Sequence, residues 1–265
     1  MKARFWQMMA AALVVCISTT AQAQESAWVS ADYAQVRLIA AEKQAGLEVR
    51  LAPGWHAYWR MPGDGGLAPE MDWSGSQNLK EAQTLWPVPR RFVDLDMHSF
   101  GYEDHFILPL DVSAADAAQD VKLALKLNLM VCEKICVPQN FDVALDIPAQ
   151  RVAGTHDARI AAVALPHAGD TDALKIENMV IGPDAIVARI YAAQGFGALD
   201  VFVEGGDLYV TAPPEVTVDE KDPLYAQVRV ASPNGIENLF NELSGKPVTL
   251  TVTDGQNAIE RRFEF

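Results

Sequence analysis

The segment Val121-Lys122-Leu123-Ala124-Leu125-Lys126-Leu127-Asn128-Leu129 decides the fold, because its large apolar residues alternate with polar or small ones. A period of two residues is typical of a β-strand that buries one face. The same alternation returns in Phe141-Asp142-Val143-Ala144-Leu145-Asp146-Ile147. We therefore expect either two antiparallel strands here or one strand that bends between the two segments.

Two cysteines, Cys132 and Cys136, lie between these segments. In an extended strand their Cα atoms would be about 13 Å apart, whereas a disulfide needs about 7 Å or less. Residues 133–135 must therefore turn if the pair oxidises. The disulfide would close a ring of about five residues and stabilise the protein by roughly 2 kcal/mol, against about 4.7 kcal/mol for a hundred-residue loop. The pair is therefore better suited to chemistry than to structural stabilisation.

Short alternating segments also occur in other parts of the chain and predict further strands. They cover residues 34–40, 46–51, 185–191, 199–203, 208–210, 226–230 and 248–252. Turn signals such as Gly205-Gly206 and Asp254-Gly255 separate the later segments. A short helix is expected within residues 236–243.

The distribution of these segments divides the chain into two domains. Residues 24–150 form the first and residues 174–265 the second. Residues 151–173 are Ala-rich and lose the alternation, so we expect a linker with one short helix at most. Short strands at this spacing are typical of β-sandwiches. The expected fold is therefore all-β, with two sandwich domains joined by a short Ala-rich linker.

Residues 1–23 have the pattern of a cleavable signal peptide. A positive start, a short apolar run and a small-residue cleavage site follow one another at Lys2 and Arg4, residues 8–17, and Ala21-Gln22-Ala23. No later segment reaches the ~20 apolar residues of a membrane helix. We expect export, compatible with a bacterial periplasm, cleavage after about Ala23, and no membrane span thereafter. Because Cys16 would leave with the signal, the mature chain would keep only Cys132 and Cys136.

The charge balance excludes two classes of partner. The chain has 21 basic and 35 acidic residues, a net charge of −14. Loss of Lys2 and Arg4 with the signal leaves 19 basic and 35 acidic residues, a net charge of −16. Nucleic acid and anionic membranes both need a basic patch, so neither is an expected partner.

An aromatic run followed by a glycine-rich loop stands out in residues 53–67. It has two interpretations: an exposed platform for a ligand or partner, or core packing by Trp55 and Trp59 with an Arg60–Asp64 ion pair ordering the loop. We favour core packing. The five histidines are not accompanied by a nucleophile elbow, so a hydrolytic triad is not predicted.

The cysteine pair itself has three interpretations. It can be a dithiol–disulfide couple that exchanges with a partner through a mixed disulfide, a local structural disulfide, or a soft two-thiolate metal site. Thioether and imidazole groups nearby, at Met97, His98, His105 and Met130, raise the possibility of copper(I), which prefers soft ligands. These residues lack ordinary metal-ligand spacing, so no metal site is assigned.

Several motifs together resemble a known family, the N-terminal periplasmic part of the DsbD/ScsB thiol–disulfide interchange reductases. The motifs occur in the family's order and are, along the chain, Gly54-Trp55-His56-Ala57-Tyr58-Trp59-Arg60-Met61-Pro62-Gly63-Asp64-Gly65-Gly66-Leu67, Asp72-Trp73-Ser74-Gly75, Trp86-Pro87-Val88-Pro89-Arg90-Arg91-Phe92, Gly101-Tyr102 and Val131-Cys132-Glu133-Lys134-Ile135-Cys136-Val137-Pro138. The resemblance covers roughly residues 28–147, and the later β-rich region resembles the continuation in ScsB-like members.

The resemblance implies an immunoglobulin-like sandwich with one redox cysteine pair. Electrons would reach it from cytosolic thioredoxin through a membrane domain and a thioredoxin-like domain, and would pass to periplasmic substrate proteins such as disulfide isomerases. It also implies that Cys136 forms the mixed disulfide and that Cys132 resolves it. By the same resemblance, Phe100-Gly101-Tyr102 matches a cap loop over the cysteines.

The sequence thus predicts two immunoglobulin-like β-sandwich domains and a periplasmic thiol–disulfide exchange protein, a reductase-type oxidoreductase component without a cofactor. Its expected partners are a membrane-bound or thioredoxin-like electron donor and a periplasmic acceptor that contains a disulfide. Because the sequence shows no membrane or thioredoxin-like domain up to Phe265, the donor is expected to be a separate protein. The alternative is a copper-handling or adaptor module that binds through its Cys, Met and His residues or its Trp-rich face.

Overall fold

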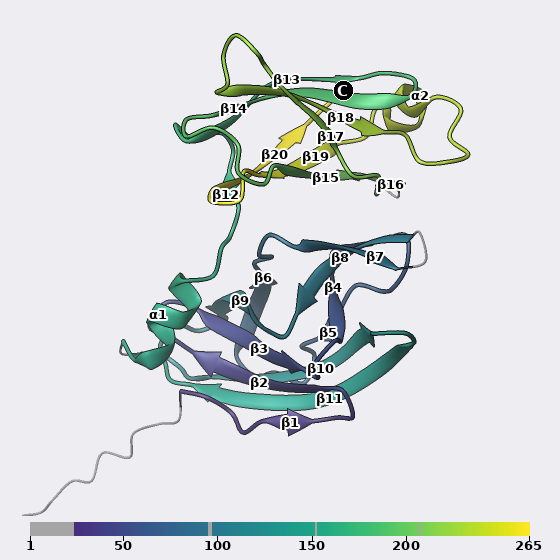
Figure 1. Ribbon diagram of the computed structural model, residues 1–265. Coiled ribbons are helices and arrows are strands. Elements are labelled where there is room, and N and C mark those ends of the chain that lie inside the picture. Colours follow the sequence, from purple (N-terminus) through teal and green to yellow (C-terminus); the bar gives the residue numbers. More distant parts are fainter. Residues whose placement is uncertain (1–23, 95–96, 152, 207) are drawn as a thin grey trace, which may run out of the picture.

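The computed structural model describes residues 24–94, 97–151, 153–206 and 208–265. The expected signal peptide, residues 1–23, lies outside the described residues. The regular secondary structure of the described residues is almost entirely β-strand, and the strands gather into two separate pairs of sheets (Figure 1). The prediction of an all-β, two-domain fold is therefore confirmed.

The first domain packs two sheets against each other. Along one sheet the strands are ordered β1 (Val29–Ser30), β2 (Ala34–Ala40), β3 (Ala45–Leu51), β9 (His105–Ala114) and β6 (Leu79–Thr84). Along the other they are ordered β11 (Cys136–Ile147), β10 (Val121–Cys132), β4 (His56–Gly63), β8 (Met97–Glu103) and β7 (Arg90–Asp94), with β5 (Glu70–Asp72) paired to β10.

Strands β10 and β11 form a long antiparallel hairpin that confirms the prediction from the alternating segments. Their register runs without a break from Val121 opposite Ile147 to Cys132 opposite Cys136. The apolar members of the pattern are buried in the core, whereas Lys122 and Lys126 are exposed. A shift of the strand pairing by one residue would expose the apolar side chains of the pattern to solvent, so the burial pattern fixes the register. Residues 133–135 form the turn.

The second domain also consists of two sheets. One carries β12 (His167–Ala168), β20 (Ala258–Phe263), β19 (Val248–Thr253), β15 (Asp200–Gly205) and β16 (Leu208–Val210); the other carries β13 (Leu174–Ile181), β14 (Ala185–Ala192), β18 (Tyr225–Ala231) and β17 (Glu215–Val218). A single short helix, α2 (Leu239–Leu243), lies within the segment predicted to be helical, and the side chain of Asn238 caps it by accepting a hydrogen bond from the Asn241 amide.

The segment expected as a linker contains the helix α1 (Thr155–Ala161) and strand β12. Helix α1 packs on the outer face of the first domain, where Ile160 contacts a small cluster that includes Ile39 and Ile107. The helix therefore belongs structurally to the first domain, whereas β12 pairs in parallel with β20 of the second.

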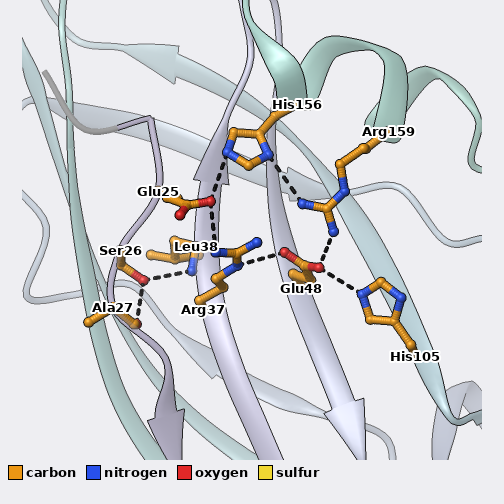
Figure 2. Close-up of polar contacts among 9 residues, drawn as sticks. All are labelled: Glu25, Ser26, Ala27, Arg37, Leu38, Glu48, His105, His156 and Arg159. Atoms are coloured by element: carbon orange, nitrogen blue, oxygen red, sulfur yellow. Dashed lines mark hydrogen bonds and ion pairs between the residues drawn. The ribbon is translucent and has the colours of Figure 1, made fainter. Parts of the chain in front are cut away.

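A buried carboxylate fastens α1 to this face (Figure 2). Glu48 of β3 is fully buried and accepts hydrogen bonds from Arg37 (2.7 Å), from His105 (2.7 Å) and from Arg159 of α1. Burial alone would raise the pKa of Glu48, but the hydrogen bonds from Arg159, Arg37 and His105 outweigh it and lower the pKa to about 2. His156 of α1 extends the network to Glu25. The helix is thus held by charge pairing as well as by apolar packing.

Candidate functional site

The two cysteines lie at the end of the β10–β11 hairpin and are joined by a disulfide. Cys132 is the last residue of β10 and Cys136 is the first of β11, and their Cα atoms are 4.1 Å apart. The pair is asymmetric, because Cys132 is only 3% exposed whereas Cys136 is exposed. A thiol from another protein can therefore reach Cys136 but not Cys132.

Tyr58 supplies the polar partner of the buried sulfur. Its hydroxyl donates a hydrogen bond to Cys132 Sγ at 2.8 Å, and the same oxygen lies 3.6 Å from Cys136 Sγ. The pairing of β4 with β10 places His56 opposite Cys132 and so brings Tyr58, two residues later, to the disulfide. Tyr58 is itself only 3% exposed, so the hydrogen bond is shielded from water.

A glycine-rich turn lies against the ring of Tyr58. Gly66 has φ +102°, and a Cβ built on it would lie 2.1 Å from that ring, so the turn needs glycine at this position. A Cβ on Gly65 would lie 3.6 Å from the thioether sulfur of Met97. Together with Ser99 and the hairpin turn, these residues line a pocket of about 190 Å³ beside the two cysteines. The turn and Met97 therefore cover Tyr58 and flank the disulfide.

The residues expected to form a cap loop lie within strand β8. Phe100 is fully buried and packs edge-to-face on Phe202 of the second domain, with ring centroids 5.1 Å apart. Tyr102 is 6% exposed and donates a hydrogen bond to the carbonyl of Pro87. Gly101 pairs with Tyr58 of β4, and a Cβ on it would meet the Ala57 carbonyl oxygen at 1.8 Å. The structure thus gives Phe100 and Tyr102 contacts away from the two sulfurs.

The aromatic run packs mainly into the first domain, as core packing predicts. Trp59 is fully buried, and Trp55, half-buried, stacks on Tyr33 with ring centroids 3.8 Å apart. The predicted Arg60–Asp64 ion pair is wrong. Arg60 points to the second domain and pairs with acidic residues there, whereas Asp64 accepts hydrogen bonds from the His98 amide and from a second-domain threonine.

The residues considered for copper do not converge as a set. His105 binds Glu48 of the neighbouring strand, in the sheet that does not carry the cysteines, whereas Met97 lines the pocket beside them. Within the described ranges, no group of three or more His, Cys, Asp or Glu side chains is placed to hold a metal ion.

Sequence reasoning missed the role of Tyr58 and of the Gly63–Gly66 turn. Tyr58 lies in the aromatic run between Trp55 and Trp59, and only the pairing of β4 with β10 brings it close to a cysteine 74 positions away. A pattern signal did exist, since the segment before the glycines can alternate as a strand, with Tyr58 and His56 on one face and Trp59 on the other.

Comparisons with known proteins agree with this architecture. Residues 25–147 match the family "Thiol:disulfide interchange protein DsbD, N-terminal", and residues 164–265 match a domain of unknown function (DUF8393). The crystal structure of the N-terminal periplasmic domain of ScsB from Proteus mirabilis is similar, with a TM-score of 0.69 and 22% sequence identity over 92% of this chain and 98% of that one. A search of curated proteins gave no match.

The structural likeness extends over both domains, so this chain, with its two immunoglobulin-like β-sandwiches, shares the fold of that ScsB domain. In the part of this chain that the structure describes, no helix is long and apolar enough to cross a membrane. The match over residues 25–147, together with a cysteine pair held at the hairpin end, identifies a thiol–disulfide interchange module. The first domain of this chain therefore belongs to the DsbD N-terminal domain family.

Proposed function

We propose that this protein relays reducing equivalents between protein partners through the Cys132–Cys136 couple. The observation that carries the proposal is the asymmetry of the pair: Cys136 is exposed, whereas Cys132 is buried and accepts a hydrogen bond from Tyr58. An exchanging disulfide needs one accessible sulfur to be attacked and a second sulfur that leaves easily as a thiolate. The exposed Cys136 and the hydrogen-bonded Cys132 meet these two requirements.

Reduction of the pair proceeds in two displacements. A thiolate of the donor attacks Cys136 Sγ, the Cys132–Cys136 bond breaks, and Cys132 leaves as a thiolate that accepts the hydrogen bond of Tyr58. The second thiolate of the donor then attacks the donor sulfur of the mixed disulfide and releases the Cys136 thiolate. Two electrons have passed, the donor has become a disulfide, and the Cys132–Cys136 pair is a dithiol.

Transfer to the acceptor reverses these roles. The Cys136 thiolate attacks the acceptor's disulfide and forms a mixed disulfide, and one acceptor sulfur leaves as a thiolate. Cys132 then attacks Cys136 Sγ, which restores the intramolecular disulfide and releases the reduced acceptor. Cys136 is thus the residue that bonds to partners and Cys132 is the resolving residue. We propose a membrane-bound or thioredoxin-like donor, a disulfide-containing acceptor and a periplasmic location, the compartment named for the similar ScsB domain.

Trapping the mixed disulfide tests this proposal. Removal of the resolving thiol in Cys132→Ser leaves Cys136 able to attack but unable to be released, so the variant should accumulate partner-linked adducts in periplasmic extract. The matched control Cys136→Ser should trap far less, because its remaining thiol is buried. Equal trapping by both variants would refute the assigned roles. A midpoint potential below about −300 mV, typical of structural disulfides, would refute exchange itself.

A second candidate function is copper(I) binding by the reduced pair. Met97 lines the same pocket as Cys132 and Cys136, so the reduced site would offer three sulfur ligands of the kind that Cu(I) prefers. Titration of the reduced protein with Cu(I) in competition with a chelator tests this function. Tight binding that falls in Met97→Leu would support it, and failure to compete would exclude it.

A further inference from the structure

The second domain reaches the redox-bearing sheet of the first through paired charges. Arg60 of β4 binds Glu204 of β15 through two hydrogen bonds, Nε–Oε1 at 3.0 Å and Nη2–Oε2 at 2.6 Å, and also pairs with Glu260 of β20. Arg91 of β7 binds Asp200 of β15, with Nη2–Oδ1 at 2.8 Å. Such two-pronged arginine–carboxylate pairs fix orientation as well as distance. The two domains are therefore held at a defined angle.

An aromatic side chain of the second domain also packs against the first domain. Phe202 of β15 is 1% exposed, and its ring lies 5.8 Å from Trp59 and 5.1 Å from Phe100, centroid to centroid and edge-to-face in both cases. Phe202 thereby joins the buried cluster of the first domain, although it comes from the second. Strand β15 lies on the side of the second domain that faces the first (Figure 1), and Phe202 is its contribution to the first domain's buried cluster.

One further contact leads from this interface to the cysteines. Thr211, which follows β16 and is 6% exposed, donates a hydrogen bond of 2.6 Å to Asp64 Oδ1. The other carboxylate oxygen accepts the His98 amide at 2.9 Å, and the Asp64 amide donates to the His98 carbonyl at 2.8 Å. Asp64 is the second residue of the Gly63–Gly66 turn, so Thr211 holds this turn from the second domain.

The Gly63–Gly66 turn packs against Tyr58, the tyrosine that contacts the buried sulfur of Cys132. The backbone of Gly66 lies directly against the ring of Tyr58, since a Cβ there would come within 2.1 Å of it. The Tyr58 hydroxyl donates to Cys132 Sγ at 2.8 Å. A continuous series of contacts therefore runs from Thr211 through Asp64, Gly66 and Tyr58 to Cys132.

We propose that the second domain, of a family without an assigned function, is a positioning element of the redox site, and that Thr211 is its positioning residue. By holding Asp64 and the turn against Tyr58, it keeps the Tyr58 hydroxyl aimed at Cys132, which leaves as a thiolate when Cys136 is attacked. The inference rests on the proposed function only in taking Cys132–Cys136 as the redox pair.

The test measures the rate at which glutathione reduces the disulfide in the full two-domain protein, followed by alkylation of the thiols that appear. Thr211→Val should slow reduction by about twofold to tenfold, the range that one hydrogen bond provides. Thr211→Ser, which keeps the hydroxyl, should restore the rate. The matched control is Thr253→Val, because Thr253 donates to the Asn257 carbonyl within the second domain. It should leave the rate unchanged.

A second measurement separates positioning from general destabilisation. If Thr211 acts through Tyr58, Thr211→Val should have no further effect in the Tyr58→Phe background. An equal slowing in both backgrounds, or no slowing in the parent protein, would overturn the inference. Because glutathione replaces the protein partner, these rates do not depend on relay. A normal response to glutathione with no adduct in the trapping experiment would overturn the proposed function alone.

Discussion

The hydrogen bond from Tyr58 to Cys132 gives the most direct prediction. Tyr58→Phe removes only the hydroxyl and leaves the buried ring in place. A hydrogen bond to a charged group contributes about 1.5–3 kcal/mol, and 1.36 kcal/mol corresponds to about one pKa unit. Because Tyr58 is only 3% exposed, water should not replace the lost donor. We therefore expect the pKa of the Cys132 thiol to rise by about 1 to 2 in the reduced protein.

The assay needs a single titrating thiol, so both proteins carry Cys136→Ser and the thiolate of Cys132 is followed by ultraviolet absorbance against pH. Tyr102→Phe is the matched control, because Tyr102 is also a buried tyrosine of the same sheet but donates to the Pro87 carbonyl. The control should lose stability without changing the pKa of Cys132. An unchanged pKa in Tyr58→Phe, or equal changes in the two variants, would refute the role assigned to Tyr58.

Three further predictions concern stability. Folding lowers the pKa of Glu48 from 4.5 to about 2, so the unfolded chain binds more protons than the folded one between these pH values. The free energy of unfolding in urea should therefore fall by about 3 kcal/mol as the pH is lowered from about 4.5 to 2. Glu48→Gln should lose this pH dependence. Phe202→Ala should lower the free energy of unfolding by about 3–5 kcal/mol; a loss below about 1 kcal/mol would contradict its burial in the shared core. Gly66→Ala should lower the free energy of unfolding by about 1–3 kcal/mol, because the new Cβ would overlap Tyr58. The loss should exceed that of Gly169→Ala, where φ is also positive but a Cβ would meet no atom within 4 Å outside the neighbouring residues.

The local pattern predicted the parts of the fold that depend on neighbouring residues. The alternation of residues 121–129 and 141–147 predicts either two antiparallel strands or one bent strand, and the β10–β11 hairpin is the first of these; the geometry of extended strands predicts a turn at residues 133–135 if the cysteines form a disulfide. Burial of one face is a local property of a strand, so a single segment reveals it. The position of the cysteines at the hairpin end followed from the same argument.

Contacts between distant segments were not predictable in this way. Arg60 was paired with the nearby Asp64, but its partners are Glu204 and Glu260, more than 140 positions away. Phe202 belongs to a strand that was expected, yet nothing in its own segment indicates that it enters the other domain's core. Charge and aromatic character predict that a side chain needs a partner, whereas the packing of the two sandwiches decides which partner it finds.

The unbroken β10–β11 ladder has a consequence for the energy of the redox cycle. Backbone pairing extends to Cys132 and Cys136 themselves, so the strands hold the two sulfur-bearing residues opposite each other through contacts other than the disulfide. The disulfide closes a ring of about five residues, so its constraint on the unfolded chain stabilises the fold by only roughly 2 kcal/mol, equivalent to about 45 mV for a two-electron couple. The protein can therefore cycle between its oxidised and reduced forms with little reorganisation of its backbone. In the proposed relay, most of the thermodynamic drive would then come from the partners, as a carrier that both accepts electrons and gives them up requires.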